Sequence, residues 1–490
     1  MNLFTIKNKM ADLLILGCLG AWFASVLFVT GCDQQETTWA KRYAYNTDFG
    51  TTALQAGDGG VFHLTATGRL IKVDETGAIL WQKSYDRCKP VAMALTNDGD
   101  LIAAGPWSCD SPEKVNPVGM MRIDSEGNVR WAKSYNSSYT HLIHGIDCNQ
   151  LDGSIIMAGG DYDPEASYSP LLRERVTRFD GDGNSLWEKT IDTESPMAIT
   201  DLKISSDEGF IMADNAGVIT KMSPSGAVEW RTKCETGAIG YVKEWMGCSI
   251  EETSDGYMVV GNTEEEEVAV VWLMKLDRSG GKVWAKTIHN VTGGSVWGEE
   301  NPNDGMMVWA NREYHDHALS IKKTADGGYA LLGKTDKVAR TNVTPFYCRV
   351  TYTGGWIIKI DEEGAISWQK KYADDFRYEH YTGDAPGGEI FYTTIGIRSF
   401  DVTAENGFIL SGAIHEPSGS RPNALLLMCD ERGDIAHTKL NIQNAQATIK
   451  PALFSTVSAQ GVLQDLSEFT PIDETIVATQ LDPGFIVDDL

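Results

Sequence analysis

The sequence lacks the short motifs that mark the common hydrolytic and redox active sites. It has no G-x-S-x-G nucleophile elbow, no H-E-x-x-H metalloprotease motif and no C-x-x-C pair. After residue 38 it also lacks any apolar pattern of helical period, so no helical signal competes with the strand signal. These absences argue against a helical body and against the chemistries that those three motifs mark.

Positive charge is also scarce. Lys and Arg number 42 against 68 Asp and Glu, which gives a formal net charge of −26. A body this acidic repels nucleic acid and anionic membrane surfaces, so we exclude DNA and RNA as partners. Solubility is the simplest explanation of the charge.

What the sequence does contain is one phrase in several copies, Asp-x-x-Gly-x-x-x-Trp. The Asp can accept a hydrogen bond from its own backbone two residues later and the Gly can take a positive φ, so the first four residues predict a hairpin turn. The residues that follow alternate as in a strand, and we expect the Trp to pack one repeat against the next. Complete copies begin at Asp74, Asp124, Asp180, Asp277 and Asp361; Ser223 begins a copy without the Asp, and Asp430 begins one with His437 in place of Trp.

A second phrase, Asp-Gly before an apolar run, precedes each copy by about one hairpin, as at Asp326-Gly327. One repeat therefore predicts a meander of four antiparallel strands with tight first and third turns. Trp-to-Trp spacings, from 43 residues between Trp187 and Trp230 to 84 between Trp284 and Trp368, fit blades with loop insertions. The predicted fold class is all-β, a β-propeller of four-stranded antiparallel blades.

The two ends of the chain set the predicted number of blades. Residues 39–43 (WAKRY) repeat the Trp strand without the three strands that should precede it, and residues 441–490 are about one period long. We expect the N-terminal strand to join C-terminal strands in a last blade that closes the ring and removes its free edges. This favours eight blades, with 441–490 as the closing blade. The alternative is seven blades with an extra edge strand, because 441–490 has no Asp-Gly phrase.

The N-terminus resembles a bacterial lipoprotein signal peptide. Lys7 and Lys9 precede an apolar stretch, and Gly31 comes directly before Cys32, as in a lipobox. The resemblance implies that Cys32 is acylated and anchors the chain to a membrane, while an uncleaved membrane anchor stays open as the alternative. The predicted domains are a signal peptide (1–31), a tether (32–38) and a single propeller domain (39–490).

Asp33 bears on which membrane holds the anchor. An Asp directly after the acylated cysteine resembles the signal for retention in the inner membrane of enterobacteria. We therefore expect a cell-envelope protein on the periplasmic side of the inner membrane, with the outer membrane as the alternative.

Candidate binding residues are expected at one face of the propeller. If both tight turns of each blade lie at one face, the long middle loops and blade-to-blade connections lie at the other, and that face favours function. Two neighbouring connections supply the candidates Trp297, Trp309, Glu313, His315, His317, Tyr378, His380 and Tyr381. On a strand, His315 and His317 would share a face and could bind a metal ion with a nearby carboxylate, although a solvated surface loop is the simpler interpretation.

The cysteines suggest two disulfides. Cys88 and Cys109 both fall on the loop-rich face, and Cys234 and Cys248 bracket one connection, so each pair is a candidate. Cys429 replaces an apolar residue of other repeats and predicts a buried thiol.

The repeated phrases resemble the tandem repeats of bacterial quinoprotein-like (PQQ-like repeat) β-propellers over residues 39–440, and the lipid anchor resembles that of envelope lipoproteins of this class. One relative, the propeller lipoprotein of the outer-membrane β-barrel assembly machinery, is a scaffold. Quinoprotein dehydrogenases hold their cofactor under adjacent cysteines. Because this chain has no Cys-Cys pair, the resemblance does not extend to pyrroloquinoline quinone, and we predict no cofactor.

The sequence thus favours a lipid-anchored, non-catalytic scaffold that binds an envelope protein or a glycan through its loop-rich face. The alternative is a metal-assisted hydrolase or lyase that acts on an extracellular polymer and uses the region of His315 and His317. The sequence leaves enzymatic activity undecided, with the non-catalytic role preferred.

Overall fold

The structure is a computed structural model, and every element that it describes is a β-strand. It describes residues 38–43, 50–107, 117–136, 140–162, 171–192, 198–235, 248–265, 268–290, 297–300, 307–343, 346–373, 394–415, 423–436, 441–444, 447–451, 455–458, 462–465, 470–473, 478–480 and 487–489. Within these ranges, no helix has the length and apolar character needed to cross a membrane.

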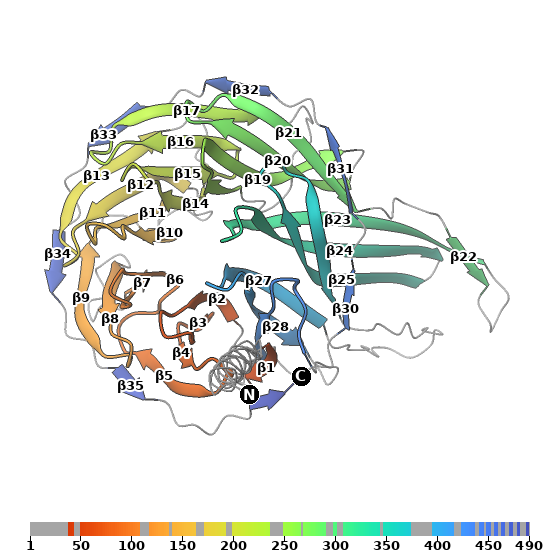
Figure 1. The fold of residues 1–490 in the computed structure, drawn as a ribbon, viewed down its shortest axis with the longest axis horizontal. Helices are drawn as coiled ribbons and strands as arrows, with labels where there is room; N and C mark the ends of the chain where they lie inside the picture. Colours follow the sequence, from red (N-terminus) through yellow and green to blue (C-terminus); the bar gives the residue numbers. More distant parts are fainter. Residues whose placement is uncertain are drawn as a thin grey trace, which may run out of the picture. The chain divides into compact units, whose positions relative to one another are not determined.

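The strands form seven antiparallel sheets, which we call blades 1 to 7, and Figure 1 shows them arranged in a ring. The first three blades are β2 (Gly50–Gln55), β3 (Val61–Thr65), β4 (Leu70–Val73) and β5 (Ile79–Tyr85) in blade 1; β6 (Ala92–Leu95), β7 (Leu101–Pro106), β8 (Val118–Ile123) and β9 (Val129–Asn136) in blade 2; and β10 (Thr140–Cys148), β11 (Ile155–Tyr162), β12 (Leu171–Phe179) and β13 (Ser185–Asp192) in blade 3.

The remaining blades continue in the same order. They are β14 (Ile199–Ile204), β15 (Phe210–Asp214), β16 (Val218–Met222) and β17 (Val228–Glu235) in blade 4; β18 (Ser249–Glu252), β19 (Gly256–Glu265), β20 (Val268–Asp277) and β21 (Lys282–Asn290) in blade 5; β22 (Trp297–Glu300), β23 (Met307–Lys323), β24 (Tyr329–Val343), β25 (Phe346–Ile360) and β26 (Ile366–Ala373) in blade 6; and β27 (Thr394–Val402), β28 (Phe408–His415), β29 (Asn423–Cys429) and β1 (Trp39–Tyr43) in blade 7.

The C-terminal segment adds one outer strand to every blade, and we call these seven strands the belt. They run around the rim in reverse blade order, as the blue strands of Figure 1 show. The belt consists of β30 (Asn441–Asn444) on blade 6, β31 (Ala447–Pro451) on blade 5, β32 (Ser455–Ser458) on blade 4, β33 (Val462–Asp465) on blade 3, β34 (Thr470–Asp473) on blade 2, β35 (Ala478–Gln480) on blade 1 and β36 (Val487–Asp489) on blade 7.

The prediction of eight blades is wrong, because the structure has seven. Strand β1 pairs with β29 from Trp39 opposite Met428 to Tyr43 opposite Ala424, so it is the fourth strand of blade 7. Residues 441–490 form no closing blade, since each outer strand of the ring already offers an unpaired edge that a short belt strand can cover. Closure of the ring by both ends is confirmed, with β1 held between β29 and β36.

The repeated phrase forms the predicted turn. At Asp277, for example, Oδ1 accepts hydrogen bonds from the backbone N–H groups of Ser279 (2.8 Å) and Gly281 (2.9 Å), and Gly280 has φ of 80°. Short local bonds of this kind determine the hairpin independently of the rest of the fold.

The Trp and Tyr of the phrase pack against the turn of the next blade. Trp81 of blade 1 donates from Nε1 to the Ser125 carbonyl (2.8 Å), and Tyr85 donates from its hydroxyl to the Gly127 carbonyl (3.2 Å) in blade 2. The predicted packing role of the Trp is therefore confirmed. Contact between ring and glycine recurs seven times around the circle, at Trp39 and Gly77, Trp81 and Gly127, Trp131 and Gly183, Trp187 and Gly226, Trp230 and Gly280, Trp284 and Gly364, and Trp368 and Gly433.

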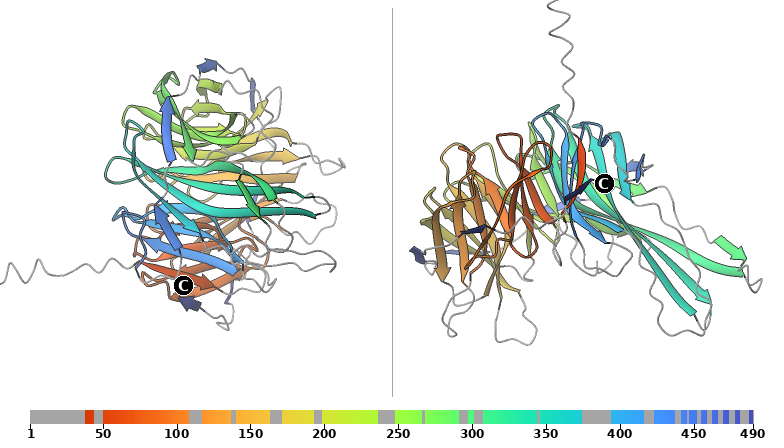
Figure 2. Two further views of the ribbon diagram at one scale, coloured as in Figure 1. Left: turned by 90° about the vertical axis from the view of Figure 1, so that its right-hand side faces the viewer. Right: turned by 90° about the horizontal axis from the view of Figure 1, so that it is seen from below.

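Blade 6 differs from the others in the length of its strands. Strands β23, β24 and β25 contain 17, 15 and 15 residues, and Figure 2 shows them continuing beyond the neighbouring blades. We call residues 307–317, 335–343 and 346–354, together with β22, the arm. It lies on the side of the middle loops and blade-to-blade connections, because the β24–β25 connection and the start of β23 belong to these two classes.

Candidate functional site

The innermost strands meet around the axis of the ring (Figure 1), and five successive blades place a charged residue at the next-to-last position of that strand. The signs alternate around the axis. We call this set the axial ring: Asp147 in β10, Lys203 in β14, Glu251 in β18, Lys322 in β23 and Asp401 in β27. Blades 1 and 2 have the uncharged Leu54 and Ala94 at the same position.

Two acidic members of the axial ring, Asp147 and Asp401, bridge from one blade to the next. Asp147 accepts a hydrogen bond from the Ile204 N–H of blade 4 (2.8 Å). Asp401 accepts from the Gln55 N–H of blade 1 (3.1 Å) and from Lys322 Nζ of blade 6 (2.7 Å). These side chains therefore join neighbouring blades close to the axis.

Asp201 adds a fourth carboxylate beside the axial ring. Its Oδ2 accepts from the Ser249 hydroxyl (2.6 Å) and from the Ile250 N–H (3.0 Å), both in blade 5. With Asp201, this group of charged residues near the axis has four carboxylates against two ammonium groups, so acidic side chains outnumber basic ones in it.

The pKa values of Asp147, Glu251 and Lys203 are all raised, by burial for the two acids and by neighbouring carboxylates for the lysine. Burial raises the pKa of Asp147 and of Glu251, and the nearby lysines offset only part of that rise. Burial alone would lower the pKa of Lys203, but the surrounding carboxylates, Asp201 first among them, raise it instead. The negative charge of Asp401, which lies three blades away, also raises the pKa of Lys203, so charges interact across the axis.

The axial ring was missed by sequence reasoning. Its signal was available, because each member stands just before the first tight turn of its repeat. Aligning the strands that precede the Asp-Gly phrase would have shown the alternation. Chemically, the ring can hold the blades in register and present fixed charges of both signs to a group on the axis.

A second polar cluster lies in blade 3. The Arg175 side chain is fully buried and donates to Asp161 (2.6 Å from Nη2 to Oδ2) and to Glu188. Beside it, Glu174 accepts from the Ile199 N–H of blade 4 (3.0 Å), and its carboxylate lies 3.7 Å from His144 Nδ1. His144 forms a β-bulge in β10, because the register with β11 shifts between Ile143 and Gly145.

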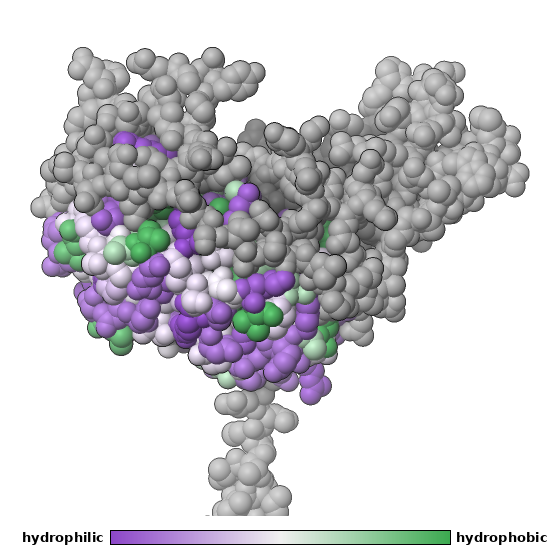
Figure 3. All heavy atoms as spheres, turned by 90° about the horizontal axis from the view of Figure 1, so that it is seen from above, coloured by the Kyte–Doolittle hydropathy of each residue, from purple (hydrophilic) through white to green (hydrophobic). Residues whose placement is uncertain are grey.

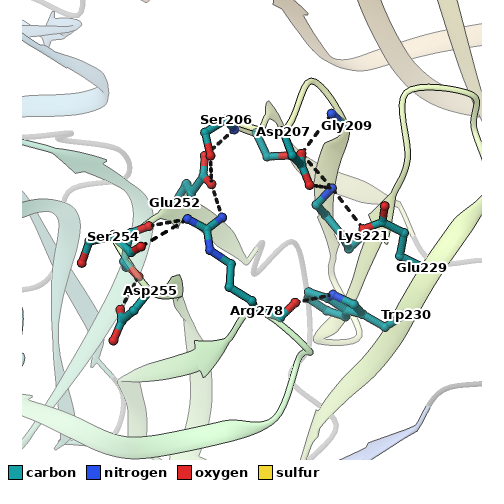
Figure 4. A network of polar contacts seen from close by, with 12 residues as sticks. Ser206, Asp207, Gly209, Lys221, Glu229, Trp230, Glu252, Ser254, Asp255 and Arg278 are labelled. Carbon is teal, nitrogen blue, oxygen red and sulfur yellow. Dashed lines mark hydrogen bonds and ion pairs between the residues drawn. The ribbon is translucent and has the colours of Figure 1, made fainter.

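The face of the tight turns is cross-linked by its own ion pairs, and Figure 4 shows the network of blades 4 and 5. Glu252 accepts from the Ser206 N–H and hydroxyl (both 2.7 Å) and pairs with Arg278. Lys221 pairs with Asp207 at 2.8 Å. A Lys or Arg of the third strand pairs in the same way with the turn Asp of other blades, as Lys275 does with Asp255. These turn carboxylates are thus paired with cations of their own fold.

The structure places the first group of predicted binding residues in the arm. Trp297 lies in β22, and Trp309, Glu313, His315 and His317 lie in β23, so these residues belong to strands and not to a loop. Across the strands, Trp297 pairs with Ala310, His315 pairs with Asp336 of β24, and His317 pairs with Lys334.

The second group of predicted binding residues, Tyr378, His380 and Tyr381, lies outside the described residues, as do Cys32 and Cys109. Cys88, Cys234 and Cys248 are buried free thiols in the structure. Cys234 and Cys248 belong to one hydrophobic cluster, and both disulfides stay predictions. Cys429 is buried, as predicted. Among the side chains that the structure describes, no three His, Cys, Asp or Glu residues are grouped to hold a metal ion.

Residues 328–335 (GYALLGKT) fit the P-loop pattern G-x-x-x-x-G-K-T. A P-loop connects a strand to a helix and turns its backbone N–H groups toward phosphate. In this chain the segment runs into β24, which pairs with β23 on one side and with β25 on the other. The sheet uses the backbone groups that a phosphate would need, so the pattern has no such role.

Comparison with known proteins gives no family. No protein-family model and no curated protein matches the chain. Among solved structures, a protein of unknown function from Bacteroides caccae has 11% identity and a TM-score of 0.35, covering 66% of this chain and 93% of that one. A quinohemoprotein alcohol dehydrogenase, ADHIIG, from Pseudomonas putida HK5 has 10% identity and a TM-score of 0.42, with 81% and 76% covered. The C-terminal WD40 domain of Sif2 has 11% identity and a TM-score of 0.40, with 78% and 82% covered. The assignment as a β-propeller rests on the sheet order.

Proposed function

We propose that this chain is a lipid-anchored propeller of the bacterial cell envelope that binds an envelope protein or a glycan as a non-catalytic scaffold. The arm is the observation that carries the proposal. It extends one blade on the side of the long connections, whereas the turns of the opposite face are short and paired with one another. Length and aromatic side chains have thus been added where they do not serve ring closure.

The surface that the structure describes fits a scaffold role. Figure 3 shows one side of the molecule, on which hydrophilic residues prevail and hydrophobic ones form small separate groups. The large exposed apolar side chains of the described residues include Leu80, Leu151 and Leu186, each on a different blade or turn. Specific binding therefore has to come from a built feature, and the arm is the largest of these.

Site-specific photo-crosslinking in living cells tests the binding face. A crosslinker at Trp309 or Tyr347 in the arm should trap one defined partner, and the same crosslinker at Asn97 or Ser254 on the turn face should trap none. Partners trapped only from the turn face, or none from either, would overturn the proposal. A glycan partner would instead appear as retention on envelope polysaccharide that is lost when the arm residues 335–353 are replaced by a short turn.

The anchor is tested separately. A Cys32→Ser variant should no longer incorporate a fatty-acid analogue and should leave the membrane fraction. If it still takes up label, the lipid is elsewhere and the assignment of Cys32 is wrong. The position of Asp33 favours the inner membrane, so fractionation of the wild-type chain should place it there.

A further inference from the structure

We propose that the axial ring binds a free α-amino acid, whose carboxylate pairs with Lys203 of blade 4 and whose ammonium group pairs with Glu251 of blade 5. Both residues belong to the innermost strands β14 and β18 and not to the arm, so the site does not depend on the scaffold function. Two pairs of unlike charges occupy equivalent positions of the ring, and they differ in one respect.

Blades 6 and 7 contain a closed pair. Lys322 donates from Nζ to Asp401 at 2.7 Å, so each charge has its counter-charge within the fold. Lys203 and Glu251 hold the same positions in blades 4 and 5, again a lysine followed by a carboxylate. Among the residues that the structure describes, however, they form no hydrogen bond or ion pair with each other or with a third group. We call Lys203 and Glu251 the open pair.

The open pair is positioned by a contact two residues earlier on the same strands. Both strands run toward their tight turns, and Asp201 of β14 accepts from the Ser249 hydroxyl of β18 at 2.6 Å. Lys203 and Glu251 each lie two residues further on, and therefore on the same side of the strand as the contact. The charge of Lys203 is accordingly the largest electrostatic influence on the pKa of Glu251, which it lowers against the effect of burial.

An open pair in this place has a cost that a ligand can remove. Lys203 and Glu251 are both half-buried, so water reaches only part of each side chain. A charge that is partly withdrawn from water and has no counter-charge in contact destabilises the fold. A bound cation would satisfy Glu251 but would be repelled by Lys203, and a bound anion would meet the reverse situation. A zwitterion satisfies both charges and adds no net charge to the ring.

An α-amino acid carries the two groups that the open pair requires. Its ammonium and carboxylate groups stand on one carbon atom, so a single small molecule can accept from Lys203 Nζ and donate to the Glu251 carboxylate. Charge-assisted hydrogen bonds of this kind are about 2.7–2.9 Å long and stronger than bonds between neutral groups. These contacts select the group that all amino acids share, and not a particular side chain.

Thermal unfolding of the full chain with each of the common L-amino acids, followed by calorimetry, tests the site. At least one amino acid should raise the melting temperature and bind with one equivalent per chain. Two analogues of that amino acid, one without its amino group and one without its carboxylate, should each bind at least about tenfold more weakly, because each loses a charge-assisted hydrogen bond. The proposal is overturned if no amino acid binds, or if either analogue binds as tightly as the amino acid.

Blade 5 provides matched control variants. Lys203→Met and Glu251→Gln should each weaken binding at least about tenfold. Lys275 and Asp255 form a closed pair at 2.8 Å on the turn face, so Lys275→Met and Asp255→Asn remove the same charges and should bind like the wild type. Equal weakening by these control variants would assign binding to net charge and reject the site. Melting without ligand shows whether each variant is folded, and Lys203→Gln replaces Lys203→Met if that variant unfolds.

Discussion

At the scale of single residues, the glycine of the repeated phrase has two roles. It takes the positive φ of the turn, and its lack of a Cβ leaves room for the Trp ring of the preceding blade. Gly127 has φ of 78°, a conformation that costs other residues about 1–2 kcal/mol, and a Cβ there would lie 3.0 Å from the Trp81 ring. Gly99 has a similar φ of 84°, but a Cβ there would meet nothing within 4 Å. The two positions therefore separate backbone strain from blade packing.

We predict that Gly127→Ala destabilises the protein more than Gly99→Ala. The change at Gly99 should cost about 1–2 kcal/mol of unfolding free energy through strain alone. The change at Gly127 should cost about 1–3 kcal/mol more, because the Trp81 ring must move. Urea unfolding of both variants measures the difference, and equal costs would show that the ring does not need the glycine.

Asp214 is a buried carboxylate whose ionisation opposes folding. Burial raises its pKa to about 6, although its Oδ1 accepts from the Ala216 (2.9 Å) and Val218 (2.8 Å) N–H groups. The folded pKa lies above the ordinary value of 3.8. Protonation of Asp214 therefore adds stability at acidic pH, and this contribution is lost as pH rises through about 6.

We predict that Asp214→Asn stabilises the protein at pH 8 by up to about 3 kcal/mol and that this gain disappears near pH 4. Asn keeps an oxygen at the Oδ1 position, so the turn retains its two hydrogen bonds. Asp277→Asn is the control, because Asp277 accepts the same pair of bonds but hydrogen bonding to Ser279 holds its pKa below the ordinary value. Urea unfolding at several pH values tests both, and a gain at pH 8 from Asp277→Asn would contradict the explanation.

At the scale of elements, the belt covers edges that the blades leave open. The fourth strand of each blade would otherwise present unpaired N–H and C=O groups at the rim, a surface on which strands of other molecules add. Each belt strand has only three to five residues, so each contact is weak alone. The covalent continuity of the belt joins these weak contacts into one constraint around the whole ring.

We predict that a chain ending at residue 440 unfolds at a lower urea concentration than the full chain and self-associates as its concentration rises. A chain ending at residue 480 loses only β36, which pairs with β1. It should show a smaller loss of stability and little association. Light scattering and urea unfolding measure the two effects, and a monomeric 440-residue chain of full stability would mean that the belt does not protect the edges.

At the scale of the whole molecule, seven equivalent contacts form a closed circle with no end blade. The turn at Asp430 has no Trp of its own on the following strand, and Trp39 has no turn of its own before it. The turn at Asp430 and the Trp strand at Trp39 together complete one copy of the motif, because β1 pairs with β29 as the fourth strand of blade 7. The axial ring adds contacts between blades 3 to 7 near the axis, as between Lys322 and Asp401.

We predict that Trp39→Ala destabilises the protein as much as Trp81→Ala, by about 3–5 kcal/mol. Both side chains are nearly buried, and both donate from Nε1 to a turn carbonyl at 2.8 Å, Trp39 to Glu75 and Trp81 to Ser125. A frayed N-terminal strand would make the Trp39 change much milder. Thermal unfolding of the two variants under the same conditions distinguishes a closed circle from an open one.

The sequence by itself determined the repeating unit, because a unit of this kind is held together locally. The Asp-x-x-Gly turn forms from bonds within five residues, and alternation then assigns the strands, so the four-stranded antiparallel blade and the packing role of Trp were predicted correctly.

The tertiary structure alone decided the number of blades and the role of residues 441–490, whose strands form the belt. The belt strands are too short to specify a sheet, and the edges that they cover exist only after the seven blades have closed. The alternation of charge in the axial ring likewise becomes a property of the protein only when distant strands are brought around one axis. Local chemistry thus defines each blade, whereas the number of blades, the belt and the axial ring follow from closure of the ring.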